Sequence, residues 1–170
     1  PSYFEVFQKL GIELTDAVVR YLTSAFVQRY SLSVVRSGVE PTLKALSKRY
    51  TLVCVTSRET LAEVMQELKF LRIDNFFNHV VTVDVTTKHL GLASLPFFPF
   101  HEQRRKLYQC ALALARCSPH SAVVIGDMAR ELEPAKKLGI TTIGLLTHNA
   151  RKKELQETCD FMISSMTQLQ

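Results

Sequence analysis

Two hydroxyl side chains, Thr56 and Ser57, directly follow residues 50–55, an apolar segment rich in β-branched residues. A continuous run of this kind is typical of a strand that is buried on both faces. The amphipathic residues 58–71 predict a helix just after the hydroxyls, and the free N–H groups at a helix start can bind phosphate oxygens. This arrangement could hold a phosphate group, whereas the simpler alternative is that Ser57 caps the helix.

Two carboxylates, Asp127 and Glu131, follow a second apolar segment, residues 122–125. Gly126 allows the backbone to turn tightly there. The spacing of the two acids places them on one face of the helix predicted over residues 128–138. Carboxylate oxygens are the ligands that Mg²⁺ prefers. The segment therefore predicts a magnesium site formed by Asp127 and Glu131, with a simple helix cap by Asp127 as the alternative.

These motifs need a framework in which the ends of strands meet. Strands are predicted for the apolar segments 50–55, 80–83, 122–125, 140–145 and 161–163. Helices are predicted at 58–71, 104–116, 128–138 and around Leu155, and residues 86–99 are expected to be irregular. This alternation predicts an α/β fold, a Rossmann-like three-layer domain with a mainly parallel sheet. In such sheets ligands bind at the carboxyl ends of the strands, where both motifs lie.

The composition is that of an ordinary globular protein, with 170 residues, 46% hydrophobic and 22% charged. No apolar run approaches the ~20 residues of a transmembrane helix, so we expect no membrane association. The four cysteines form no Cys-x-x-Cys motif, which favours an intracellular compartment, the cytoplasm or the mitochondrial matrix. The net charge of +5, with clusters at 104–106 and 151–153, fits solvated helix ends, phosphorylated metabolites or a polyanion such as RNA.

The two motifs together resemble those of the haloacid dehalogenase (HAD) superfamily of phosphotransferases and hydrolases. Thr56 matches the hydroxyl motif that orients the transferring phosphoryl group. The run Gly-Asp-Met-Ala-Arg-Glu at 126–131 resembles the motif Gly-Asp-x-x-x-Asp, whose acids bind magnesium and orient its shell. The resemblance implies a Mg²⁺-dependent phosphatase that acts on a small phosphorylated substrate. It also implies that residues 1–36 are the remnant of a helical cap and residues 37–170 the α/β core.

The superfamily also uses a lysine that neutralises the phosphate, and two places in this sequence compete for that role. Counting forward from the second predicted strand favours Lys88. Counting back from Asp127 leads to Arg104, Arg105 or Lys106. The two counts differ because residues 90–100 resemble an insertion. Lys88 is the favoured candidate, and Thr56, Ser57 and Lys88 are together the predicted catalytic residues.

The nucleophile of the superfamily, the first Asp of an Asp-x-Asp motif, is missing from the sequence. The aspartates are Asp16, Asp74, Asp84, Asp127 and Asp160, and none has a second aspartate two residues away. In the superfamily this motif ends a central strand that lies between those predicted at 50–55 and 122–125. Either a strand outside these residues fills that place, or a partner chain supplies one, or the two neighbouring strands pair directly.

Two functions therefore stay open. One is a magnesium-dependent phosphatase whose nucleophile lies on a further strand. The other is a catalytically inactive protein with a HAD fold, acting as a structural or assembly subunit of, for example, a ribonucleoprotein complex. In the second case the basic surface and the proline- and phenylalanine-rich loop 90–100 are the expected partner contacts.

Overall fold

The computed structural model describes residues 10–11, 34–95, 99–147, 150 and 152–170. The chain divides into two units, Pro1–Val34 and Val35–Gln170, and the described helices and strands all belong to the second. The cap predicted for residues 1–36 lies almost entirely outside the described residues. None of the described helices is both long enough and apolar enough to cross a membrane.

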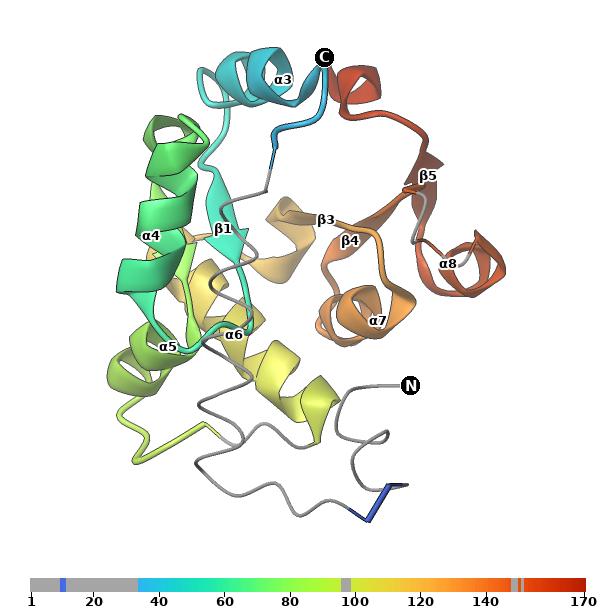
Figure 1. Cartoon of the computed structure of the whole chain (residues 1–170). Helices are drawn as coiled ribbons and strands as arrows, with labels where there is room; N and C mark the ends of the chain where they lie inside the picture. The colour runs from blue at the N-terminus through green and yellow to red at the C-terminus, as the bar shows by residue number, and fades with distance from the viewer. Residues whose placement is uncertain (1–9, 12–33, 96–98, 148–149, 151) are drawn as a thin grey trace. The chain divides into compact units, whose positions relative to one another are not determined.

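Helices and parallel strands alternate along the second unit (Figure 1). The described strands are β1 (Val53–Val55), β2 (His79–Val81), β3 (Val123–Gly126), β4 (Thr141–Leu145) and β5 (Phe161–Ile163). The described α-helices are α3 (Val39–Leu46), α4 (Leu61–Phe70), α5 (Val83–His89), α6 (Phe100–Ala115), α7 (Ala129–Lys137) and α8 (Lys152–Thr158). The predicted α/β fold is confirmed.

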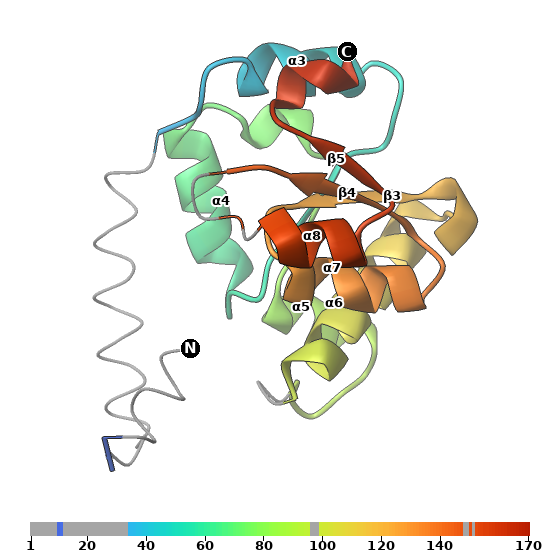
Figure 2. The ribbon, with the colours of Figure 1, turned by 90° about the vertical axis from the view of Figure 1, so that its right-hand side faces the viewer.

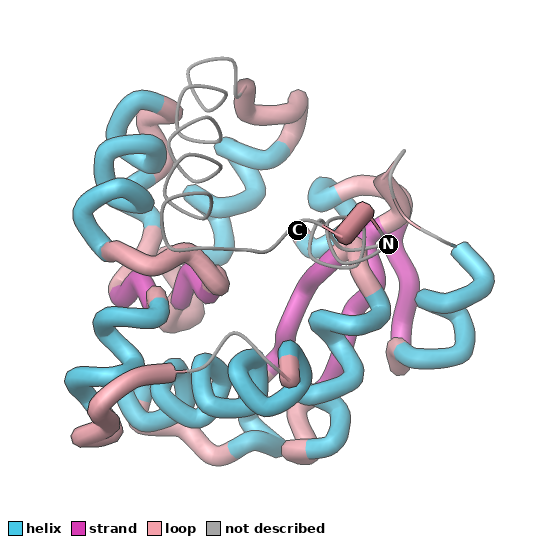
Figure 3. The backbone as a smooth tube through the Cα atoms, turned by 60° about the horizontal axis from the view of Figure 1, so that its bottom comes forward, coloured by secondary structure: helices cyan, strands magenta, loops and turns pink. Residues whose placement is uncertain are grey.

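The described strands form two parallel sheets. One sheet has the order β1-β2 and the other β3-β4-β5. Val55 lies opposite Val81 in the first sheet, and Gly126 lies opposite Gly144 in the second. β5 is an edge strand, as its short apolar sequence suggests. Figure 3 shows the strands in two separate groups, so the carboxyl ends of β1 and β3 are not joined by backbone pairing in the described structure.

Helices cover both faces of the β1-β2 sheet. Val53 and Val55 pack with Leu107 of α6, whereas Leu52 and Cys54 pack with residues of α3 and α4 on the opposite face. Alternate residues of a strand point to opposite faces, so a strand buried on both sides needs the uninterrupted apolar run seen in the sequence. The three-layer arrangement is therefore present around β1 and β2.

The β3-β4-β5 sheet is covered on one face by α7 and α8 (Figure 2). On its other face three apolar residues are exposed to solvent: Val123 by 55%, Ile125 by 37% and Phe161 by 61%. Ile125, Ile143 and Phe161 form one row across the three strands. The described part of the chain thus leaves an apolar face of this sheet open.

Helix α5 occupies a segment for which the sequence predicts a strand end followed by irregular chain. Its β-branched residues are poor helix formers. Val83 and Thr86 are nevertheless buried, and the N–H of Val83 donates to the carbonyl of Arg58. Tertiary packing therefore outweighs local preference. Helix α6 likewise begins at Phe100 rather than near residue 104.

Candidate functional site

Thr56 and Ser57 lie in the loop that leaves the carboxyl end of β1. The N–H of Thr56 donates to the carbonyl of Val81 at 3.0 Å, which extends the pairing of β1 with β2 by one residue. The Thr56 hydroxyl accepts from the N–H of Arg58 at 3.4 Å. The Ser57 hydroxyl is buried without a hydrogen-bond partner among the described residues. Thr60, not Ser57, caps α4 through its side chain, so the simple capping role considered for Ser57 does not hold.

Asp127 directly follows β3, and Glu131 lies in the first turn of α7. Gly126, the last residue of β3, packs closely against α7, since a Cβ there would lie 3.2 Å from Cδ2 of Leu132. One Asp127 carboxylate oxygen accepts from the Thr147 hydroxyl at 3.0 Å. The carboxylate of Glu131 is paired with the guanidinium of Arg104. The two predicted magnesium ligands are therefore held by different partners.

Arg104 of α6 connects the end of β1 with the start of α7. Its side chain is only 8% exposed, and its Nη1 lies 3.5 Å from the carbonyl oxygen of Val55, the residue before Thr56. Its Nη2 donates to Oε1 of Glu131. The Arg104 guanidinium also lies over the ring of Phe100, 5.7 Å from the centroid. This residue therefore brings a fixed positive charge to the strand end that carries the two hydroxyls.

Tyr108, one turn after Arg104 on α6, fixes the same junction. Its hydroxyl donates to the backbone carbonyl of Glu131 at 2.9 Å. Burial raises the pKa of the Tyr108 phenol to about 12, although the Arg104 charge opposes this increase. The phenol is therefore a neutral hydrogen-bond donor at physiological pH. The sequence gives one signal for Arg104 and Tyr108: their spacing places both on one side of a helix.

The other candidates for the phosphate-neutralising cation lie elsewhere. Lys88 is an exposed residue of α5 and lines a hollow of about 470 Å³ together with Glu59 and Asp84. Arg105 pairs with Glu102 on the surface of α6, and Lys106 follows it on that helix. Of the predicted cations, Arg104 is the one that contacts both the end of β1, at the carbonyl of Val55, and Glu131 of the second motif.

Asp84, the remaining acid near a strand end, has a structural role. Both of its carboxylate oxygens accept from the N–H of Leu61 at the start of α4, at 3.1 and 3.2 Å. Partial burial raises the pKa of the Asp84 carboxyl, but hydrogen bonds from Thr82, Leu61 and Val85 lower it by more than burial raises it. The net pKa of Asp84 therefore lies below its ordinary value. Asp84 therefore caps α4 as an ionised carboxylate.

The described residues do not fit a magnesium site formed by Asp127 and Glu131. A carboxylate that is already neutralised by a buried guanidinium is a poor ligand for a second cation. Within the described ranges, no three His, Cys, Asp or Glu side chains come together in a way that could hold a metal ion. Of the two predicted magnesium ligands, Glu131 is paired with Arg104, whereas Asp127 accepts a hydrogen bond from the neutral Thr147 hydroxyl.

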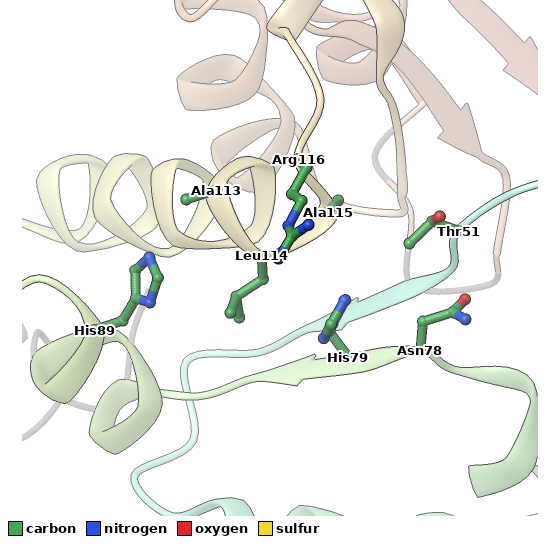
Figure 4. Close-up of a pocket in the computed structure, with 8 residues that line it drawn as sticks. All are labelled: Thr51, Asn78, His79, His89, Ala113, Leu114, Ala115 and Arg116. Atoms are coloured by element: carbon green, nitrogen blue, oxygen red, sulfur yellow. The ribbon is translucent and has the colours of Figure 1, made fainter.

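A larger hollow lies away from these residues. Figure 4 shows its lining, which comes from the chain before β1, the start of β2 and the ends of α5 and α6. Its volume is about 590 Å³ and its side chains include His79, His89 and Arg116. Strands β1 and β2 start here and end at Val55 and Val81, so this hollow is at the opposite end of the sheet from the predicted site.

The similarity of the chain to known proteins agrees with the strand-end motifs. Residues 1–145 match the family described as haloacid dehalogenase-like hydrolase. The chain belongs to this family. The match covers most of the chain and includes β1, α6, β3 and α7, which position Thr56, Arg104, Asp127 and Glu131.

Individual relatives of this hydrolase family are distant. The pyrophosphatase PpaX of Bacillus pumilus (strain SAFR-032) is 24% identical over 171 residues, which cover 99% of this chain and 74% of that protein. A hydrolase from Pseudomonas syringae has a similar structure, with a TM-score of 0.73, 19% identity and coverage of 97% and 72% of the two chains. A predicted phosphoglycolate phosphatase from Haemophilus somnus 129PT gives a TM-score of 0.66, 20% identity and coverage of 96% and 70%. At these identities the structural matches establish the haloacid dehalogenase-like fold.

Proposed function

We propose that this protein is a phosphatase that hydrolyses a small phosphorylated metabolite at the carboxyl ends of β1 and β3. The observation that carries the proposal is the position of Arg104, whose buried guanidinium contacts the end of β1 and Glu131. A fixed positive charge beside the hydroxyls of Thr56 and Ser57 can stabilise the charge of a transferring phosphoryl group. The relative named as a pyrophosphatase supports hydrolysis of a bond to phosphate as the type of reaction.

In this proposal Arg104 binds phosphate oxygens, and Thr56 and Ser57 orient them. The nucleophile is an aspartate on a further strand between β1 and β3, since the sequence contains no Asp-x-Asp pair. Direct pairing of β1 with β3 is not observed in the described structure, so the place for such a strand is not closed by hydrogen bonding between its neighbours. Magnesium is expected from the family, but Glu131, one of its predicted ligands, is paired with Arg104.

Release of phosphate from p-nitrophenyl phosphate by the complete native protein tests this proposal. The assay is run with MgCl₂ and with EDTA. Arg104→Gln is expected to reduce kcat/KM at least tenfold, whereas the surface variant Arg105→Gln is expected to change it less than twofold. Absence of phosphate release from the complete protein under both conditions would contradict the proposal.

A second candidate is a catalytically inactive subunit with a HAD fold, and the missing Asp-x-Asp pair favours it. The open apolar face at Val123, Ile125 and Phe161, together with the basic balance, would then serve a protein or ribonucleoprotein partner inside the cell, in the cytoplasm or the mitochondrial matrix. The intact mass of the native protein and a map of its N-terminal peptide distinguish the two. An upstream peptide that carries Asp-x-Asp supports the phosphatase, and a native chain without one supports the inactive subunit.

A further inference from the structure

The Arg104 side chain has more hydrogen-bonding capacity than its described partners use. A guanidinium has five N–H donors. One on Nη1 faces the carbonyl of Val55, and one on Nη2 faces Glu131. The Nε–H is buried without a hydrogen-bond partner in the described structure. A buried donor left unpaired costs about 1–3 kcal/mol, so a purely structural link between α6 and α7 does not account for this group.

A second unpaired donor belongs to the same strand end. The Ser57 hydroxyl is buried and has no partner among the described residues. It lies two residues after Val55, whose carbonyl Arg104 contacts. Two unsatisfied donors at one strand end indicate a ligand that supplies several acceptor oxygens, and a phosphate has that chemistry.

Glu131 sets the position of the guanidinium in this arrangement. The Glu131 carboxylate contacts Nη2 of Arg104 from the first turn of α7. The Phe100 ring lies against the same guanidinium from α6. These two contacts hold the guanidinium between α6 and α7. Glutamate stands here where the superfamily motif has aspartate, and its extra methylene gives the carboxylate the reach to meet the arginine.

We infer that Glu131 is a positioning residue for Arg104 and is not a magnesium ligand, and that Arg104 presents its remaining N–H groups to phosphate oxygens. The inference rests on the proposed function for the identity of the ligand. It departs from the sequence prediction, in which Glu131 binds the metal. Phosphate affinity should therefore depend on Glu131, whereas magnesium affinity should not.

Calorimetric titrations of the complete native protein test this inference, with inorganic phosphate in EDTA and with MgCl₂ alone as separate probes. Glu131→Gln and Glu131→Asp are expected to weaken phosphate binding at least fivefold and to leave magnesium binding within twofold of wild type. Arg104→Lys keeps the positive charge but loses the planar guanidinium with its several N–H donors. It is expected to weaken phosphate binding as much as the Glu131 variants do. The double variant Arg104→Lys with Glu131→Asp serves as a second test of fit between the two side chains. Arg105→Lys is the matched control.

Circular dichroism at the titration temperature selects the variants that are folded, and the Arg104→Lys comparison stands on its own if the Glu131 variants are not. A tenfold loss of magnesium affinity in Glu131→Gln or Glu131→Asp would overturn the inference while leaving the phosphatase proposal intact. Phosphate binding by Arg104→Lys that equals wild-type binding would also overturn the inference and leave the phosphatase proposal intact. A wild-type protein that binds no phosphate, with or without MgCl₂, would overturn both proposals.

Discussion

Nη2 of Arg104 donates to Oε1 of Glu131 across the interface between α6 and α7. The two side chains are 8% and 19% exposed. Removing one member of a largely buried ion pair leaves the other charge without compensation, so Glu131→Gln is expected to lower the free energy of unfolding by about 2–3 kcal/mol. Urea denaturation measures this change.

Two further variants make that prediction specific. Arg104→Met combined with Glu131→Gln removes both charges and should recover at least half of the loss. Arg105→Gln breaks the exposed pair with Glu102 and should cost less than about 1 kcal/mol. Equal effects of Glu131→Gln and Arg105→Gln would mean that the Arg104 pair is not buried in solution.

Tyr108→Phe removes the hydrogen bond to the carbonyl of Glu131 and is expected to cost about 1 kcal/mol. Because burial raises the folded pKa of Tyr108 to about 12, its ionisation opposes folding. This tyrosine therefore adds stability below the unfolded pKa of about 10, and that contribution is lost as pH rises from 10 towards 12. The difference in phenolate absorbance between wild type and Tyr108→Phe should develop only above about pH 11. Ionisation of this residue near pH 10 in the folded protein would argue against the buried hydrogen bond.

Asp160 should make the protein sensitive to acid. Hydrogen bonds from the N–H and hydroxyl of Thr142, together with Lys136, lower its pKa to about 2. A depressed folded pKa stabilises the fold above the unfolded value, here 3.8, and this contribution disappears as pH falls from about 4 to 2. The Tm difference between wild type and Asp160→Asn should be constant above pH 5 and should shrink over that window. Asp74→Asn is the control, and a Tm difference for Asp160→Asn that does not change with pH would contradict the prediction.

Gly38→Ala is expected to be more destabilising than Gly91→Ala. Both glycines have positive φ, 82° and 63°, so alanine is strained by about 1 kcal/mol at either position. A Cβ on Gly38 would also lie 2.5 Å from Cγ2 of Thr167, whereas nothing lies within 4 Å of one on Gly91. The clash should add about 1–3 kcal/mol in thermal or urea unfolding.

Thr167→Ser deletes the clashing methyl group and provides the control for the Gly38 prediction. The double variant Gly38→Ala with Thr167→Ser should approach the stability of Gly91→Ala. If Gly38→Ala and Gly91→Ala are equally stable, the contact between the start of α3 and the C-terminal turn is not formed.

The sequence predicts the strands well because their apolar runs are continuous. β5 has the predicted bounds, and β1, β3 and β4 each begin or end within a few residues of them. It fails at α5, because β-branched residues such as Val83 and Thr86 are poor helix formers and become helical through burial against α6. Hydrophobic periodicity reflects local preference and does not include the contribution of packing between α5 and α6.

The residues of the candidate site also divide into those that local sequence preference places and those that depend on tertiary packing. Thr56, Ser57 and Asp127 lie where the strand-end rule places them, since that rule depends only on the strands. The choice between Lys88 and Arg104 depends on where α6 begins and on what its inner face meets. The proline- and phenylalanine-rich residues before Arg104 conceal that start, so counting along the chain leaves both cations open.

Helix α6 has a consequence for how the protein unfolds. Leu107 packs against Val55 and Val81 on one sheet, and Tyr108 packs with Val124 of the other. Since β1 and β3 share no hydrogen bonds in the described structure, this helix and its contact with α7 connect the two sheets, in addition to the contact between α3 and the C-terminal turn. Amide hydrogens of β2 and β4 should therefore exchange with similar opening free energies while α6 is intact, and a proline in the middle of α6 should separate them into two independently exchanging units.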